Sequence, residues 1–390
     1  MTQVAAEPAQ GLERFPSVDA AVAALRPDVP VHALHPHRAR RAAERFVAAF
    51  PGRVIYAVKC NPHPRLLRAL RDGGVHGFDT ASAGELRAVR RQFPDVWCGF
   101  MNPVKARAAI GEAYRRFGVR HFVVDHPAEL AKIADMIGPD PEVTVLVRLR
   151  TADAGAVIHL ADKFGAEPQT AAATLARAAD QGYRPGLAFH VGSLCSRPQA
   201  YADALGQVGE VAAAASVRPR CVDVGGGFPA PNGGYPAPAP AAFMAAIREG
   251  LEALDLPADA EVIAEPGRAL VADAATLIAR IQLCKGDRLY INDGVYGSLS
   301  EPKLTGVPPR ARLIRPDGAV ATAEKAFELA GPTCDSLDIL PDPVRLPADA
   351  GEGDWLAMDS LGAYSTALAT DFNGCQPDTY IEVADDPPPG

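Results

Sequence analysis

Lys59 stands at the end of a short apolar run, where a charged amine calls for an explanation. The run belongs to the stretch RVIYAVKCN, residues 53 to 61, whose composition is typical of a buried strand. A lysine at this place is ordinarily the solvated end of a strand. It can also be a reactive amine held at the rim of a sheet, ready to attack a carbonyl group. The residues that end the other apolar runs decide between these interpretations.

Several other apolar runs end in residues that suit the chemistry of pyridoxal phosphate. This cofactor needs a lysine for its aldehyde and an acid for its pyridine nitrogen. Its phosphate needs glycine N–H groups and a guanidinium, which in barrels follow strands seven and eight. Each residue alone has an ordinary structural explanation, such as a buried histidine, a tight turn or an ion pair. The prediction rests on their coincidence at successive run ends: Lys59, Asp79, His190, Gly225, Gly226, Gly227, Glu265 and Arg268.

Eight apolar runs alternate with helix-like segments, whose apolar residues recur every three or four positions. The alternation predicts a closed parallel (β/α)8 barrel, and an open doubly wound sheet is the alternative. In a barrel the run ends meet on one face, which would bring the residues above into one site. The runs are 53–59, 75–80, 96–101, 121–125, 143–150, 186–192, 221–227 and 261–267, and the clearest helical segments are 64–73, 82–93, 127–138 and 168–182.

The pattern of apolar and turn-forming residues changes after residue 275. Short β-branched or alternating runs, separated by Asp-Gly, Gly-Asp and proline, predict a C-terminal antiparallel β-sandwich or β-barrel domain. We therefore expect a segment 1–32 that joins the β domain, a cofactor-binding barrel over 33–275, and the β domain over 276–390. The proline- and glycine-rich stretch 229–242 is expected to be a surface loop.

The composition excludes several classes of function. The 390 residues are 48% hydrophobic and 22% charged, with a net charge of -8 and no long basic run, so nucleic acid and membrane surfaces are not expected partners. Seven scattered cysteines without a C-x-x-C pair indicate neither a disulfide framework nor a zinc site. The N-terminus has no basic region followed by an apolar one, and no run is long enough to span a membrane. A cytoplasmic location is expected.

Taken together, the motifs resemble those of the fold-type-III pyridoxal-phosphate decarboxylases. This is the family of ornithine and diaminopimelate decarboxylases, related in fold to alanine racemase. The resemblance spans residues 54 to 374 in the expected order, and bacterial ornithine decarboxylases are the nearest group. It is carried by YAVKCN, GFDTAS, KFGA, FHVGS, DVGGGFP, AEPGR, YINDGVYGS, GPTCDSLD and LGAYSTALATDFNG.

The resemblance implies a role for each residue around the cofactor. Lys59 would be the Schiff-base lysine, supported by Asp79, while Glu265 would pair with the pyridine nitrogen and His190 would stack on the ring. The residues implied around the phosphate are Ser193, Gly225, Gly226, Gly227, Arg268 and Tyr364.

Two further residues are implied to act across a subunit interface. Cys334 and Asp335 of GPTCDSLD would reach the active site of the neighbouring subunit in a homodimer. The cysteine would protonate the carbanion left by CO2 loss, and the aspartate would bind the distal amine of the substrate. No metal is implied.

The substrate implied by this pattern is a basic amino acid, with L-ornithine giving putrescine and CO2 as the expected reaction. Glu301 is the acidic residue in the loop where ornithine-type relatives offer a second aspartate to the distal amine. His159 stands where eukaryotic ornithine decarboxylases have an arginine. Lysine, 2,4-diaminobutyrate, diaminopimelate and carboxynorspermidine therefore stay open as substrates. A non-catalytic regulator of the antizyme-inhibitor kind is the alternative from another class.

Overall fold

Eight parallel strands close into a barrel, as the alternating apolar runs predict. The computed structural model describes residues 11–152, 155–230 and 235–385. Each predicted run overlaps one barrel strand, although β9 begins at Arg184, two residues before its run, and the ring closes in the order β11-β12-β3-β4-β5-β6-β7-β9. The barrel prediction is confirmed. The strands are β3 (Arg53–Ala57), β4 (Gly77–Thr80), β5 (Trp97–Phe100), β6 (His121–Val124), β7 (Thr144–Arg148), β9 (Arg184–Ala188), β11 (Cys221–Asp223) and β12 (Glu261–Ala264).

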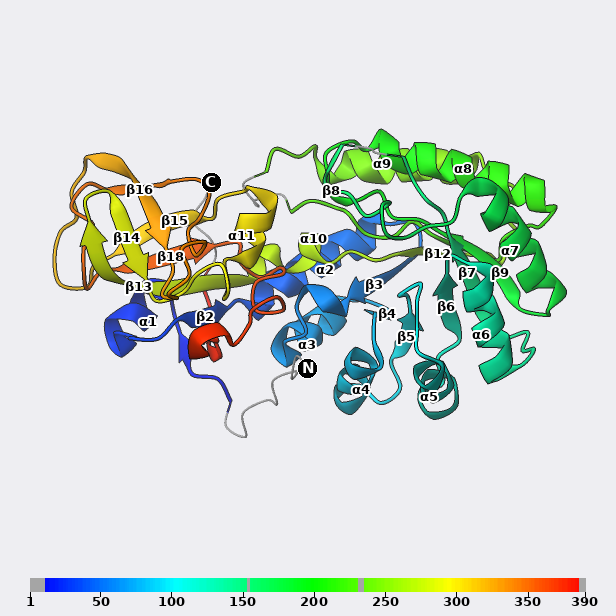
Figure 1. Cartoon of the computed structure of the whole chain (residues 1–390), viewed down its shortest axis with the longest axis horizontal. Helices are drawn as coiled ribbons and strands as arrows, with labels where there is room; N and C mark the ends of the chain where they lie inside the picture. The colour runs from blue at the N-terminus through cyan, green and yellow to red at the C-terminus, as the bar shows by residue number, and fades with distance from the viewer. Residues whose placement is uncertain (1–10, 153–154, 231–234, 386–390) are drawn as a thin grey trace.

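Helices surround the barrel and bury one apolar face each against it (Figure 1). Their ends follow local rules: α6 begins with Pro127 in its first turn and ends at Gly138, which takes a φ of 79°. The four predicted helical segments correspond to α3, α4, α6 and α7. The helices of this part are α2 (Pro36–Ala49), α3 (Pro64–Asp72), α4 (Ala83–Gln92), α5 (Arg107–Phe117), α6 (Pro127–Ile137), α7 (Pro168–Asp180), α8 (Gln199–Ala215), α9 (Pro240–Glu252) and α10 (Arg268–Val271).

The C-terminal part is a sheet structure beside the barrel (Figure 1), as predicted. Its long central strand β13 pairs antiparallel with β2, β14 and β18. Most ladders are antiparallel, while β1–β19, β2–β19 and β14–β16 are parallel. The strands are β1 (Arg14–Phe15), β2 (Val31–Leu34), β13 (Ala275–Lys285), β14 (Arg288–Ile291), β15 (Arg310–Ile314), β16 (Glu324–Ala330), β17 (Val344–Pro347), β18 (Trp355–Asp359) and β19 (Thr379–Val383).

The remaining elements of the described residues are short. The proline- and glycine-rich stretch has no helix or strand at 229–230 and 235–239, whereas Pro240 already begins α9 and 231–234 lie outside the described residues. No helix in the described ranges is long and apolar enough to cross a membrane. The short elements are α1 (Val18–Leu25), η1 (Val58–Cys60), β8 (Ala156–Ile158), β10 (Ser193–Cys195), η2 (Ala272–Ala274), α11 (Ser300–Thr305) and η3 (Phe372–Gly374).

Candidate active site

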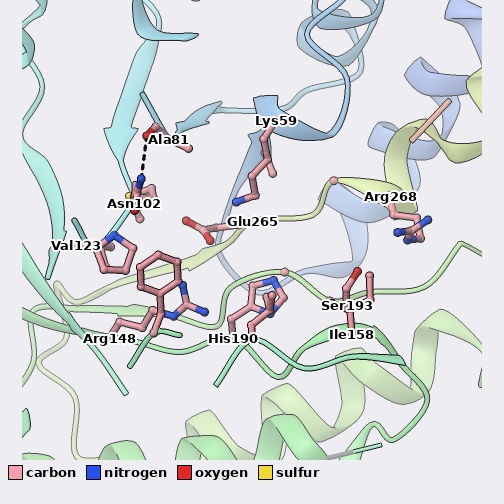
Figure 2. A pocket seen from close by; sticks show the side chains of 18 of the residues that line it. Lys59, Ala81, Asn102, Val123, Arg148, Ile158, His190, Ser193, Glu265 and Arg268 are labelled. Carbon is pink, nitrogen blue, oxygen red and sulfur yellow. Dashed lines mark hydrogen bonds between the residues drawn. The ribbon is translucent and has the colours of Figure 1, made fainter. Parts of the chain in front are cut away.

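A cavity of about 400 Å³ opens at the carboxyl ends of the barrel strands. Figure 2 shows Lys59, His190, Glu265 and Arg268 converging on it from different strand ends. The sequence-predicted residues that line it are Lys59, His190, Ser193, Gly226, Gly227, Glu265, Arg268, Glu301 and Tyr364, while Asp79 and Gly225 stand directly behind this lining, against Lys59 and Phe189.

Lys59 lies just beyond its strand rather than on it. Strand β3 ends at Ala57, and Lys59 belongs to a short 3-10 turn. The turn is fixed by Asn61, whose side chain donates to the Gly362 carbonyl at 2.8 Å and accepts from the His63 N–H at 3.0 Å. The sequence prediction of a strand through residue 59 was therefore too long by two residues.

The amine of Lys59 is oriented by a buried carboxylate. Its Nζ donates to Oδ2 of Asp79 at 3.0 Å, and Asp79 is 1% exposed. Burial opposes the charge of the amine, but the carboxylates of Asp79 and Glu265 outweigh it and raise the pKa of Lys59. The other oxygen of Asp79 is buried without a hydrogen-bond partner in the structure. The Lys59 side chain is 45% exposed, so the amine remains accessible from the cavity.

Glu265 lies deeper and shares a hydrogen bond with the buried Asp223. Burial, together with the nearby carboxylates of Asp223 and Asp79, raises the pKa of Glu265 well above its ordinary value. Its Oε1 is buried and has no hydrogen-bond partner among the described residues. A buried carboxyl oxygen of this kind is suited to a ligand nitrogen that carries a proton.

His190 is held as a neutral imidazole. Burial lowers its pKa well below the usual range, and the charges of Arg148 and Lys59 add to this effect. Its Nδ1 accepts a hydrogen bond from the Gly192 N–H at 3.0 Å, which leaves the ring proton on Nε2. The ring is thereby fixed beside the cavity, where it can pack against a planar ligand.

The three glycines after β11 form a backbone cradle in which there is no room for side chains. Gly225 and Gly227 have positive φ angles of 67° and 100°. A Cβ at Gly226 would lie 2.7 Å from the carbonyl oxygen of Glu265. Because the glycines carry no side chains, an anion can approach the backbone closely here, as a phosphate requires.

Arg268 and Tyr364 stand on the same side of the cavity. The Arg268 guanidinium lies 5.2 Å from the centroid of the Tyr364 ring, and its Nε is buried without a partner in the structure. Its terminal nitrogen donates to Glu301. Unpartnered atoms on Asp79, Glu265 and Arg268, together with the glycine cradle, fit pyridoxal phosphate in size, charge and donor pattern.

Sequence reasoning missed several residues that line the cavity. Asp223 precedes the triple glycine inside a predicted run, and Arg148 lies near the end of another, so both could have been noticed. Burial lowers the pKa of Arg148, whose guanidinium lies 5.5 Å from the Phe164 ring. The outer wall is formed by leucines, for which the sequence offered no indication: Leu160, Leu304 and Leu368.

Cys334 and Asp335 do not lie in this cavity. Cys334 is exposed and Asp335 is half-buried, and both lie on the connection between β16 and β17. Asp335 accepts hydrogen bonds from the Tyr296 hydroxyl at 2.5 Å and from the Leu337 N–H at 2.9 Å. The hydroxyl and the N–H lower the pKa of Asp335, so the carboxylate is ionised. Asp335 was predicted to bind the distal amine of the substrate, and Cys334 to protonate its reacting carbon. Within one chain, both residues lie outside the cavity.

The protein-family model described as the pyridoxal-binding domain of pyridoxal-dependent decarboxylases matches residues 37–272. Ornithine decarboxylase from Schizosaccharomyces pombe is 33% identical over 337 residues, which cover 82% of this chain and 75% of the yeast protein. The match extends beyond the barrel into the C-terminal sheet, because it covers most of the chain.

Solved structures agree with this match. The Paramecium bursaria Chlorella virus arginine decarboxylase bound to agmatine superposes with a TM-score of 0.83 at 26% identity, covering 94% of this chain and 99% of the viral one. The lysine/ornithine decarboxylase of Vibrio vulnificus, complexed with cadaverine, gives 0.81 at 30% identity, covering 95% and 100%. With more than half of its length matched by the family model and its cavity suited to the cofactor, the chain belongs to the pyridoxal-phosphate-dependent amino-acid decarboxylases.

Proposed function

We propose that this decarboxylase acts on L-ornithine and releases putrescine and CO2 in polyamine or diamine synthesis. Its relatives include proteins named ornithine decarboxylase from fungi and nematodes. The similar Vibrio vulnificus structures hold cadaverine or putrescine. Putrescine is the proposed product, and cadaverine is a diamine one methylene longer. These relatives support a basic amino acid as the substrate class, and a cytoplasmic location is part of the same proposal.

The observation that carries the proposal is the distribution of carboxylates around the cavity. Among the described lining residues the acids are Asp223, Glu265 and Glu301. The first two share a hydrogen bond in the interior, and Glu301 is paired with Arg268. The rest of the described lining includes Leu160, Leu304 and Leu368 and no further carboxylate, so none of these described residues offers an unpaired acid to a distal ammonium. An ionised acid must come from elsewhere.

Asp335 meets this need if a second copy of the chain supplies it. It is half-buried, ionised and held by Tyr296, on a loop that also carries the exposed Cys334. Leu304 and Leu368 at the cavity are 70% and 42% exposed, a surface that a partner subunit would cover. We therefore infer a homodimer in which each active site receives Cys334 and Asp335 from its partner.

When bound, pyridoxal phosphate supplies an aldehyde for the substrate amine and a ring that stabilises negative charge at Cα as the carboxylate leaves. Lys59, oriented by Asp79, would hold the aldehyde end, and Glu265 would face the pyridine nitrogen. His190 would pack on the ring as a neutral imidazole. Ser193, Gly225, Gly226, Gly227, Arg268 and Tyr364 would surround the phosphate.

Proton return to the product is assigned to the thiol of Cys334. Its Sγ is exposed and lies 3.5 Å from the side-chain oxygen of Asn373, which orients it. A thiol carried on the partner's loop would deliver a proton to Cα after CO2 has left. Lys59 would then release the amine product.

The test is CO2 release measured on ornithine, lysine, arginine, diaminopimelate, 2,4-diaminobutyrate and carboxynorspermidine. Ornithine is expected to give the highest kcat/KM. A higher value for another diamino acid would replace ornithine as the substrate, and no release from any of them would overturn the basic-amino-acid proposal. Lys59→Ala should remove both activity and the visible absorbance that pyridoxal phosphate produces on the wild-type protein.

A further inference from the structure

We propose that Glu301 sets the affinity of the chain for the phosphate of its cofactor by neutralising Arg268. The sequence suggested another role for this residue, as a second acid for the substrate's distal amine. The new inference rests on the proposed placement of Arg268 against the phosphate. It makes Glu301 a positioning residue that acts through the arginine.

The contact that supports the inference is buried and direct. Glu301 lies on the short helix α11, and its Oε1 accepts a hydrogen bond from a terminal nitrogen of Arg268. Both side chains are only 10% exposed, and both line the cavity. Holding the two long side chains together in this way fixes the guanidinium.

Arg268 still has donors to offer in this arrangement. Its Nε is buried and has no partner in the structure, while the Tyr364 ring packs 5.2 Å from the guanidinium carbon. In Figure 2 Arg268 lies beside Ser193, on the opposite side of the cavity from Asn102 and Val123. A phosphate bound at this end can thus reach the arginine without displacing Glu301.

The charge of Glu301 works against such a phosphate. The charges of Arg268 and Glu301 sum to zero, whereas the phosphate carries about two negative charges at neutral pH. The hydrogen bond from Arg268 favours binding by fixing the guanidinium, and the carboxylate opposes binding by repulsion. In a site shielded from water, repulsion between full charges outweighs the gain from orienting one side chain.

Glu301→Gln separates these two effects. Glutamine has the same length, and its amide oxygen can still accept from Arg268, but it carries no charge. The full-length protein, stripped of cofactor, is titrated with pyridoxal phosphate and with pyridoxal, which has the same ring and aldehyde but no phosphate. We expect the Kd for pyridoxal phosphate to fall by about tenfold in the variant and the Kd for pyridoxal to stay within about twofold. Glu249→Gln, the same change at an exposed position on α9, is the control and should alter neither value.

Three results would overturn the inference. One is an unchanged or weaker affinity for pyridoxal phosphate in Glu301→Gln. Another is an equal change in the Kd for pyridoxal phosphate and the Kd for pyridoxal, which would indicate a general effect on the cavity. A third is an unchanged Kd with a raised KM for ornithine, which would return Glu301 to the substrate. By contrast, tight cofactor binding without CO2 release from ornithine would count against the proposed substrate and leave the inference standing.

Discussion

The proposed mechanism assigns substrate binding to Asp335 and proton return to its neighbour Cys334, and the two roles can be separated kinetically. If Asp335 pairs with the distal ammonium, Asp335→Asn removes a charge-assisted contact of about 1.5–3 kcal/mol. We expect KM for ornithine to rise about tenfold to a hundredfold with little change in kcat, because the contact forms before and during the reaction alike. Asp342→Asn, the same change at an exposed position on the same connection, is the control. A fall in kcat at unchanged KM would contradict this role.

Glu85 makes a pH-dependent contribution at the rim of the site. Its Oε2 accepts from the Ala81 N–H at 2.7 Å, while its own N–H donates to Oγ of Ser82, the N-cap residue of α4. Burial raises the pKa of Glu85 to about 7, from an ordinary 4.5. Between these values the folded chain holds the proton and the unfolded chain does not. The contribution of Glu85 to stability is thus full below pH 4.5 and is lost as the pH rises towards 7.

Glu85→Gln should remove this loss. Relative to the wild type, the variant is expected to gain stability as the pH rises from 4.5 to 7, and to gain no more above that window. Urea denaturation of both proteins across this range measures the difference, in which the other buried acids cancel. Parallel profiles for the two proteins would show that Glu85 ionises alike in the folded and unfolded chains.

At the scale of elements, one buried aspartate ties the loop that carries Cys334 and Asp335 to the loop after β14. Asp338 is 2% exposed, and its carboxylate accepts from the Val295 N–H at 2.8 Å and from the N–H and hydroxyl of Thr333 at 3.1 and 2.7 Å. A Cβ added at Gly294 or Gly331 would collide with this carboxylate. The loop that is proposed to enter the partner's site is therefore shaped by its own chain.

Asp338→Asn should loosen this loop, because the amide places a donor against backbone N–H groups. We expect a loss of about 1–3 kcal/mol in the free energy of unfolding. We also expect kcat to fall by about tenfold or more while the Kd for pyridoxal phosphate is unchanged. A variant with lowered stability but wild-type kcat would show that Asp338 stabilises the fold without positioning the loop.

The barrel could be predicted because its strands are buried on both faces and so read as continuous apolar runs. The end of β3 was placed two residues late because the turn after it depends on Asn61, which contacts Gly362, 301 residues further along the chain. The pairs Asp223–Glu265 and Arg268–Glu301 were equally hidden, since they join residues on different elements. Sequence motifs indicated which residues gather at the cavity, whereas the partners that tune them depend on tertiary packing.

At the scale of the molecule, β13 links the two parts of the chain. It begins directly after η2, near the end of the barrel, and continues as the centre of the C-terminal sheet, where β2 pairs along it. The sheet carries the loop of Cys334 and Asp335, and the barrel carries Lys59. If the site is shared, neither part of one chain completes it, and activity depends on how two chains combine.

Mixing two inactive variants tests this dependence. Lys59→Ala removes the amine of its own barrel, and Cys334→Ala removes the thiol that the chain is proposed to give to its partner. In a dimer of one chain of each kind, one site lacks both groups and the other lacks neither. Random exchange makes about half of the dimers mixed, so about a quarter of the wild-type activity should return.

The control is a chain that carries both substitutions, mixed with Cys334→Ala. In that mixture every site lacks the thiol, and activity should stay at the level of the variants alone. Sedimentation of the wild-type protein checks that dimers are present at the assay concentration. Because a site built within one chain could never recover by mixing, absence of any regained activity from exchanging dimers would show that Cys334 does not act in the partner's site.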